Sequence, residues 1–201
     1  HVIGVWSVEI DDVQRHDVAP WRSTPILAAS RRLTGYAVQF MRRRITTRCP
    51  AKLNLALAVA APDSDGLHPI ASWMVTVDFF DDLVVTMLDP GDLSRYAVLW
   101  HEKAPQRSEI DWSIQDDLSV RAHLALEHHV GRSLPVQMKL DKRIPVGGGL
   151  GGGSSNAASM LRAVNTLYDL KIPSNELVDL ASSLGSDVPF FLTGGSALVR
   201  G

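Results

Sequence analysis

Apolar and polar residues alternate along several stretches of the chain. In residues 49–59 every second side chain is apolar, and the opposite face carries Lys52 and Asn54. A period of two predicts a half-buried β-strand. Further strands are predicted at residues 70–79, 83–88, 136–140 and 196–199. The polar stretch at residues 89–111 is expected to form loops with one short strand.

Helical periodicity marks three other segments. Apolar residues recur at i, i+3 and i+4 in residues 155–170, and a shorter stripe predicts a helix at 117–130. A third helix is predicted at 175–184, with Ser174 as its N-cap and Gly185 as its end. Strands and helices in this order predict an α+β or mixed α/β layout, with helices covering a largely antiparallel sheet.

Composition and charge restrict the classes of partner. The chain has 201 residues, of which 45% are hydrophobic and 21% charged, and its formal net charge is -2. These values predict a globular protein and give no sign of a nucleic-acid or membrane partner, which leaves a small-molecule substrate open. Cys49 is the single cysteine, so no intrachain disulfide can form, which fits a cytoplasmic location. The sequence does not specify an oligomeric state.

The beginning of the chain differs in texture from the rest. Residues 1–45 show no sustained periodicity and become rich in arginine. A transit peptide would be rich in arginine but poor in acids, and Glu9 and Asp17 argue against one. The preferred interpretation takes Met41 as the natural start. We therefore expect a disordered or upstream extension over residues 1–45 and a folded domain over 46–201.

A glycine-rich loop separates the strand at 136–140 from the helix at 155–170. Glycine permits positive φ and lets an anion approach the backbone amides closely. The N-terminus of the following helix adds free N–H groups and a partial positive charge. The sequence therefore predicts a phosphate-binding loop made of Pro145, Val146, Gly147, Gly148, Gly149, Leu150, Gly151, Gly152, Gly153, Ser154 and Ser155.

Other interpretations of this loop fit less well. The dinucleotide-binding pattern G-x-G-x-x-G runs from Gly147 to Gly152, but Asp169 closes a helix instead of ending a strand. A Walker A loop requires lysine before Ser or Thr, whereas Gly153 precedes Ser154. A flexible linker is disfavoured because a strand pattern and a strongly periodic helix flank the loop.

The loop resembles the ATP-binding motif of GHMP kinases. Four segments in family order resemble the diphosphocytidyl-methylerythritol kinase family in particular: residues 50–55 (P-A-K-L-N-L), 65–68 (D-G-L-H), 141–158, and 184–191 (L-G-S-D-V-P-F-F). Residues 117–122 are a weaker match to the start of a family helix. Four ordered motifs are far more specific than any one of them alone.

The resemblance implies the N-terminal lobe of a GHMP kinase, a ribosomal protein S5 domain 2-like fold, without the C-terminal GHMP domain. It implies that Lys52 and Asp187 form the catalytic pair and that Asn54 and His68 bind the substrate. ATP would be the co-substrate, held by the glycine loop, and Mg²⁺ would bridge its phosphates. The implied reaction phosphorylates the 2-hydroxyl of 4-diphosphocytidyl-2-C-methyl-D-erythritol in the non-mevalonate isoprenoid precursor pathway.

The chemistry of phosphoryl transfer agrees with these residue types. Asp187 can accept the proton of the attacking hydroxyl, and Lys52 can keep Asp187 ionised and stabilise the developing alkoxide. Each residue also has a local interpretation: Lys52 as an exposed strand residue, Asp187 as the cap of the turn after Gly185, and His68 as an ordinary loop histidine. The ordered motifs favour the functional roles.

Two alternatives remain open. Leu67 stands where the family usually has a tyrosine that stacks on the cytosine, and leucine cannot stack in that way. Leu67 therefore favours another GHMP kinase, acting on a sugar, homoserine or a mevalonate-type alcohol, whereas the D-G-x-H turn at 65–68 and the D-K-R-I-P sequence at 141–145 favour the cytidyl substrate. The second alternative is a non-catalytic nucleotide-binding relative, against which the presence of both Lys52 and Asp187 argues.

No metal site is predicted. His123, His128 and His129 lie in the predicted helix at 117–130, but no carboxylate or cysteine pattern accompanies them. The sequence favours a solvated helix surface for these three histidines.

Overall fold

The computed structural model describes residues 43–59, 61 and 70–200. Five strands form one sheet in the order β1-β2-β4-β3, and β5 pairs with β2 beyond the end of β4. The strands are β1 Arg44–Val59, β2 Ile70–Met87, β3 Arg95–Trp100, β4 Val136–Lys142 and β5 Ser196–Arg200. All pairs are antiparallel except β3 with β4. This confirms the largely antiparallel sheet of an α+β fold.

The long strand β2 is the centre of the sheet. Two separate strands were expected at 70–79 and 83–88, but β2 is continuous because β1 pairs with it from Arg44 opposite Thr86 onward. The ladder between β1 and β2 has irregularities at Pro50/Ala51 and at Asn54/Ala56, which lie on either side of Lys52. Bulges increase local twist and re-aim side chains. Lys52 therefore lies in a distorted part of the ladder.

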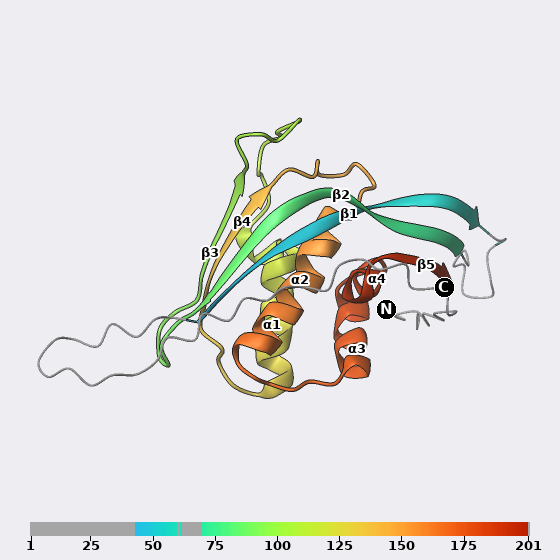
Figure 1. The fold of residues 1–201 in the computed structure, drawn as a ribbon. Coiled ribbons are helices and arrows are strands. Elements are labelled where there is room, and N and C mark those ends of the chain that lie inside the picture. The colour runs from blue at the N-terminus through green and yellow to red at the C-terminus, as the bar shows by residue number, and fades with distance from the viewer. Residues whose placement is uncertain (1–42, 60, 62–69, 201) are drawn as a thin grey trace, which may run out of the picture.

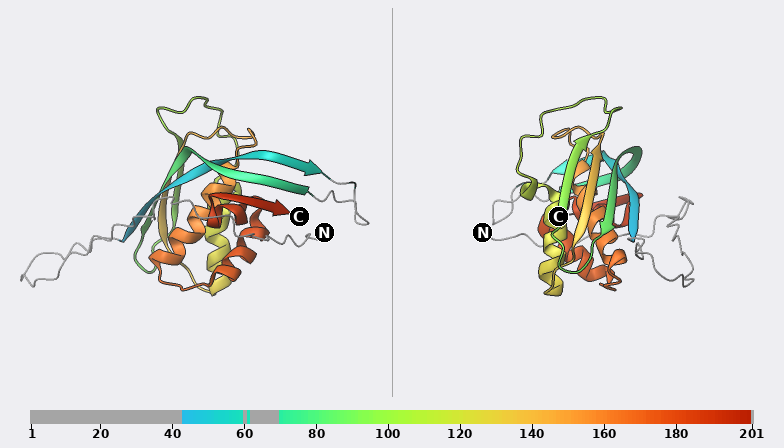
Figure 2. Two further views of the ribbon diagram at one scale, coloured as in Figure 1. Left: turned by 45° about the vertical axis from the view of Figure 1, so that its right-hand side comes forward. Right: turned by 90° about the vertical axis from the view of Figure 1, so that its left-hand side faces the viewer.

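Helices cover one face of this sheet (Figure 1 and Figure 2). They are η1 Ile114–Asp116, α1 Leu118–Val130, α2 Gly152–Leu167, α3 Ser174–Leu184 and α4 Val188–Thr193. The short helix α4 was not predicted. The expected cap by Ser174 is wrong, because Pro173 is the N-cap of α3 and no side chain makes a cap hydrogen bond there.

Helix α2 begins earlier than its apolar stripe indicated, at Gly152 instead of Ser155. Its first residue packs against Ile144, and a Cβ on Gly152 would lie 2.8 Å from Cγ2 of Ile144. Glycine at this position therefore lets the helix start inside the glycine-rich segment, close to the end of β4.

The core lies between the sheet and the helices α1 and α2. Leu83, Met138, Leu140 and Leu161 are all essentially inaccessible to solvent. Burying each such side chain contributes about 1.5–3 kcal/mol relative to exposure. The packing of α2 against β1 and β2 fixes the position of this helix and therefore of the loop before it.

One of the three helix histidines belongs to this core. His123 is fully buried: Nε2 lies 2.8 Å from the carbonyl oxygen of Leu134, and Nδ1 lies 2.8 Å from the hydroxyl of Tyr96. The expected solvated surface is therefore wrong for His123. It falls on the buried stripe of α1 with Ala122 and Leu126, and its two ring nitrogens are satisfied inside the protein.

Among the described residues, none of the helices combines the length and the hydrophobicity that a membrane span requires.

Candidate active site

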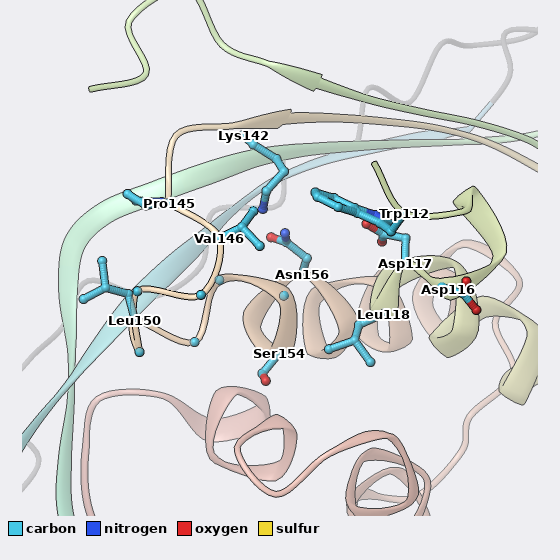
Figure 3. A pocket seen from close by; sticks show the side chains of 16 residues that line it. Trp112, Asp116, Asp117, Leu118, Lys142, Pro145, Val146, Leu150, Ser154 and Asn156 are labelled. Atoms are coloured by element: carbon cyan, nitrogen blue, oxygen red, sulfur yellow. The ribbon is translucent and has the colours of Figure 1, made fainter. Parts of the chain in front are cut away.

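The glycine-rich loop forms the wall of a cavity of about 340 Å³ between β4 and α2 (Figure 3). Gly147, Gly149 and Gly151 have φ values of 74°, 71° and 70°, in the left-handed region that favours glycine. Gly151 is the N-cap of α2, and no side chain satisfies the first amides of that helix. The cavity wall therefore offers free N–H groups and a helix N-terminus to an anion.

The loop also approaches β1 and α4 closely. A Cβ on Gly151 would lie 2.8 Å from the ring of Phe191 and 3.0 Å from Cγ of Lys52. The amide of Lys52 donates a 2.9 Å hydrogen bond to the carbonyl of Leu150. The strand that carries Lys52 and the glycine loop are therefore held in direct contact.

Lys52 and Asp187 come together beside this loop. Lys52 projects from β1, and Asp187 stands at the start of α4; Nζ of Lys52 lies 3.4 Å from Oδ2 of Asp187. Lys52 is only 6% exposed, so the interpretation as a solvated strand lysine is wrong. Asp187 makes no side-chain cap hydrogen bond, and its side chain remains 27% exposed. Asp187 can therefore meet a substrate while it faces an ammonium group.

A chain of hydrogen bonds orients Lys52. Nζ of Lys52 donates to Oδ1 of Asn54, and Nδ2 of Asn54 donates to Oγ of Ser72. The hydroxyl of Ser72 in turn donates to the carbonyl of Ala56 at 3.0 Å. Since an ammonium can only donate, Oδ1 must be the atom of Asn54 that faces it. Asn54, expected at the substrate, is therefore also in contact with Lys52.

Sequence reasoning missed a buried polar cluster behind the loop. Asp81 is fully buried in β2, and Lys142 and Asn156, both nearly buried, bond to it. Asp81 has the same strand phase as the buried Leu83 and Val85, and an acidic residue in that phase is the signal that could have revealed the cluster.

The aromatic side chain in the cavity wall was also missed. Trp112 precedes η1 and faces the cavity from the side opposite the loop (Figure 3). It lies in a polar stretch of the chain without periodicity, so no sequence pattern pointed to it.

His68 and the rest of the 65–68 motif, including Leu67, lie outside the described residues. The structure therefore does not place them relative to the cavity.

Cys49 does not belong to the reactive groups. Burial raises the pKa of Cys49 to about 12, so it remains a thiol at neutral pH.

The described residues contain no group of three or more His, Cys, Asp or Glu side chains that could hold a metal ion. The cavity wall supplies Ser154 and the carboxylates Asp116 and Asp117. Oδ1 of Asp117 already accepts the amide of Ser119 as the cap of α1. Such sparse oxygen donors fit an ion held mainly by the phosphates of a bound nucleotide, as Mg²⁺ commonly is.

Comparison with known proteins gives a consistent result. Residues 117–195 match the family described as "GHMP kinases N terminal domain". A 4-diphosphocytidyl-2-C-methyl-D-erythritol kinase of Polaromonas sp. strain JS666 is 44% identical over 152 residues, which are 76% of this chain and 49% of that protein. The enzyme of the same name from Burkholderia mallei strain SAVP1 is 42% identical over 76% of this chain and 48% of its own length.

A solved structure shows the same fold. The crystal structure of a 4-(cytidine 5'-diphospho)-2C-methyl-D-erythritol kinase superposes with a TM-score of 0.63 and 34% identity. The superposition covers 78% of this chain and 52% of that one. This chain thus spans about half the length of the curated relatives that it matches.

Proposed function

We propose, from the premise that this chain carries a GHMP kinase N-terminal domain, that it supplies the ATP-binding and catalytic groups of a cytoplasmic ATP-dependent kinase. The proposed acceptor is the 2-hydroxyl of 4-diphosphocytidyl-2-C-methyl-D-erythritol. Phosphorylation of this hydroxyl is proposed as a step of isoprenoid precursor synthesis. The names of the relatives and of the solved structure support this acceptor. We also propose that residues 46–201 form the ATP-binding domain.

The observation that carries the proposal is the position of the Lys52–Asp187 pair. The two side chains are 3.4 Å apart, and Gly151 of the loop is in contact with Lys52. A kinase needs its proton acceptor beside the phosphates, because the alcohol and the γ-phosphoryl group must meet in line. A binding module has no such requirement.

In the proposed reaction the alcohol oxygen bonds to the γ-phosphorus while the bond to the β,γ-bridging oxygen breaks, and ADP leaves. The proton of the alcohol passes to the carboxylate of Asp187. Lys52 forms an ion pair with that carboxylate and stabilises negative charge on the attacking oxygen. The amides of the loop and of the first turn of α2 bind the phosphates. Mg²⁺, when bound with ATP, would neutralise charge on the phosphate oxygens.

We propose two roles for Asn54. Its Oδ1 accepts from Lys52, so Asn54 fixes the ammonium, and it lies on the same strand face where the substrate is proposed to bind. His68 is proposed as a second substrate contact on the strength of the resemblance alone.

The test compares the full-length protein with its Asp187→Asn variant. We expect turnover of the cytidyl substrate to fall at least about 10³-fold, because the proton acceptor is lost, while the Kd for ATP changes little. Asp169→Asn is the matched control, since Asp169 forms an exposed ion pair with Lys171 away from the loop. Unchanged turnover in Asp187→Asn would remove Asp187 from catalysis.

The acceptor is tested separately. The unmodified full-length protein is offered the cytidyl substrate, galactose, homoserine and mevalonate with ATP. Turnover of the cytidyl substrate alone supports the proposal. Turnover of another alcohol replaces the acceptor and keeps the kinase, and ATP binding without turnover of any alcohol favours the non-catalytic relative.

A further inference from the structure

Asp81 makes a set of contacts that brackets the glycine loop. Its Oδ1 accepts hydrogen bonds from the backbone amides of Arg143 and Ile144, at 2.6 and 2.8 Å. Its Oδ2 accepts from Nζ of Lys142 at 2.9 Å and from Nδ2 of Asn156 at 3.0 Å. The first three donors come immediately before the loop and the fourth immediately after it.

The two carboxylate oxygens of Asp81 have different kinds of partner. Oδ1 holds only backbone, at the point where the chain leaves β4. Oδ2 holds one side chain from each end of the loop. A carboxylate with four donors is fully saturated, and Asp81 is completely buried, so these bonds are made in a medium that strengthens them.

We propose that Asp81 is the positioning residue of the glycine loop: it fixes the distance between the two ends of the loop and thereby sets the geometry of the nucleotide phosphate site. The inference rests on the proposed function, because it assigns to Asp81 a part in ATP binding. Asp81 itself touches no substrate. It acts through Ile144, which packs on Gly152, and through Asn156 in the first turns of α2.

Position matters here because the ligands of the phosphates are backbone amides on a loop without side-chain anchors. An error of about 1 Å in such a site costs about 10²-fold in rate. In the described residues, Asp81 is bonded to both ends of the loop, whereas the hydrogen bond of Leu150 to Lys52 holds its middle.

A purely structural role makes a different prediction. If Asp81 only stabilised the fold, its loss would lower the fraction of folded enzyme and hence the apparent kcat. The KM values of the surviving molecules would not change. A misplaced loop would instead raise the KM for ATP and leave the KM for the alcohol substrate unchanged.

Removing Asp81 alone would leave Lys142 as a buried, unpaired cation, which is strongly destabilising. The test therefore uses two double variants of the full-length protein that both lack the charge pair. In Asp81→Ala with Lys142→Met, the amides of Arg143 and Ile144 and the side chain of Asn156 all lose their acceptor at position 81. In Asp81→Asn with Lys142→Met, one carbonyl oxygen remains for the amides of Arg143 and Ile144.

The second double variant can also keep a hydrogen bond between position 81 and Asn156. In the structure, no donor among the described residues reaches Oδ1 of Asn156. If the Asn156 amide turns over, the new NH₂ group at position 81 can donate to that oxygen, so both ends of the loop stay connected. The two double variants therefore differ in the hydrogen bonds between position 81 and the ends of the loop, but both lack Lys142.

We expect the KM for ATP of the alanine double variant to exceed that of the asparagine double variant at least about tenfold, the scale of losing one or two neutral hydrogen bonds to the loop ends. The KM for the alcohol substrate should be the same in both. Asp82→Asn is the matched control: Asp82 is the next residue, is 31% exposed, and pairs with Nη2 of Arg143 at 2.8 Å instead of its backbone. Equal KM values for ATP in the two double variants would overturn the proposal.

A second measurement needs neither folding of a variant nor activity. In the unmodified full-length protein without nucleotide, the amides of Arg143 and Ile144 should exchange hydrogen at least about a hundredfold more slowly than those of Gly147 and Gly149. Exchange at equal rates would overturn the proposal that Asp81 holds the amides of Arg143 and Ile144. If the unmodified protein shows no ATP-dependent turnover, the proposed function fails, and this exchange measurement still decides whether Asp81 holds the loop.

Discussion

Gly149 and Gly151 allow the space around the glycine loop to be tested separately from its backbone conformation. Both glycines have nearly the same φ, 71° and 70°. A Cβ on Gly149 would have no atom within 4 Å, whereas one on Gly151 would meet the ring of Phe191 and Cγ of Lys52 at 2.8–3.0 Å. Substitution of each by alanine therefore imposes the same backbone conformation but a different amount of crowding.

The expected magnitudes follow from these contacts. An alanine in the left-handed region costs about 1–2 kcal/mol, which is the whole expected loss for Gly149→Ala. In Gly151→Ala the crowding against Phe191 adds about 1–3 kcal/mol, the usual cost of overpacking. The total for Gly151→Ala is then about 2–5 kcal/mol.

Urea unfolding of the two variants and the unmodified protein measures this difference. With a slope of about 2 kcal/mol per M, the midpoint of Gly151→Ala should lie about 0.5–1.5 M below that of Gly149→Ala. Equal midpoints for the two variants would refute the reasoning, because they would show that the loop does not pack against α4 and β1 as the structure has it.

Two further predictions concern buried groups. Cys49 should react with a thiol reagent at pH 8 only as the protein unfolds, because burial raises its pKa to about 12; prompt labelling of the native protein would contradict this. Burial lowers the pKa of His123, so between that value and the ordinary value of about 6.5 the unfolded chain binds more protons. The free energy of unfolding should therefore fall as the pH falls through this window, with a contribution of at most about 1.4 kcal/mol per pH unit. His123→Phe should lose this contribution when its denaturation curves are compared with those of the unmodified protein, and an identical pH dependence would exclude His123 as its source.

The tautomer of His123 supports the sign of that prediction. The carbonyl of Leu134 can only accept, so Nε2 carries the proton and Nδ1 accepts from the hydroxyl of Tyr96. The hydrogen bond to the carbonyl of Leu134 and the carboxylate of Glu127, 3.7 Å from Nε2, both oppose the effect of burial on the pKa of His123. Burial is the larger influence on the pKa of His123, so the folded protein favours the neutral imidazole.

The sequence alone determined the fold class and the place of the glycine loop. Period-two alternation at 49–59 and 136–140 and the stripe at 155–170 are local patterns, and each depends on burial of one face. Strand, loop and helix follow one another directly around Gly147–Gly153, so their order in space needed no long-range information. The sequence motifs also pointed to Lys52 and Asp187 as partners, and the structure places them 3.4 Å apart.

Only the tertiary structure decided the features that depend on contacts between distant segments. The sequence predicts separate strands at 70–79 and 83–88, yet β2 runs without a break through Asp81, which is buried there because four donors from residues 142–156 saturate it. The sequence predicts a surface position for His123, yet Tyr96 and Leu134 satisfy both of its ring nitrogens inside the protein. A buried polar side chain costs free energy unless its partners are present, and those partners are known only when the chain has folded.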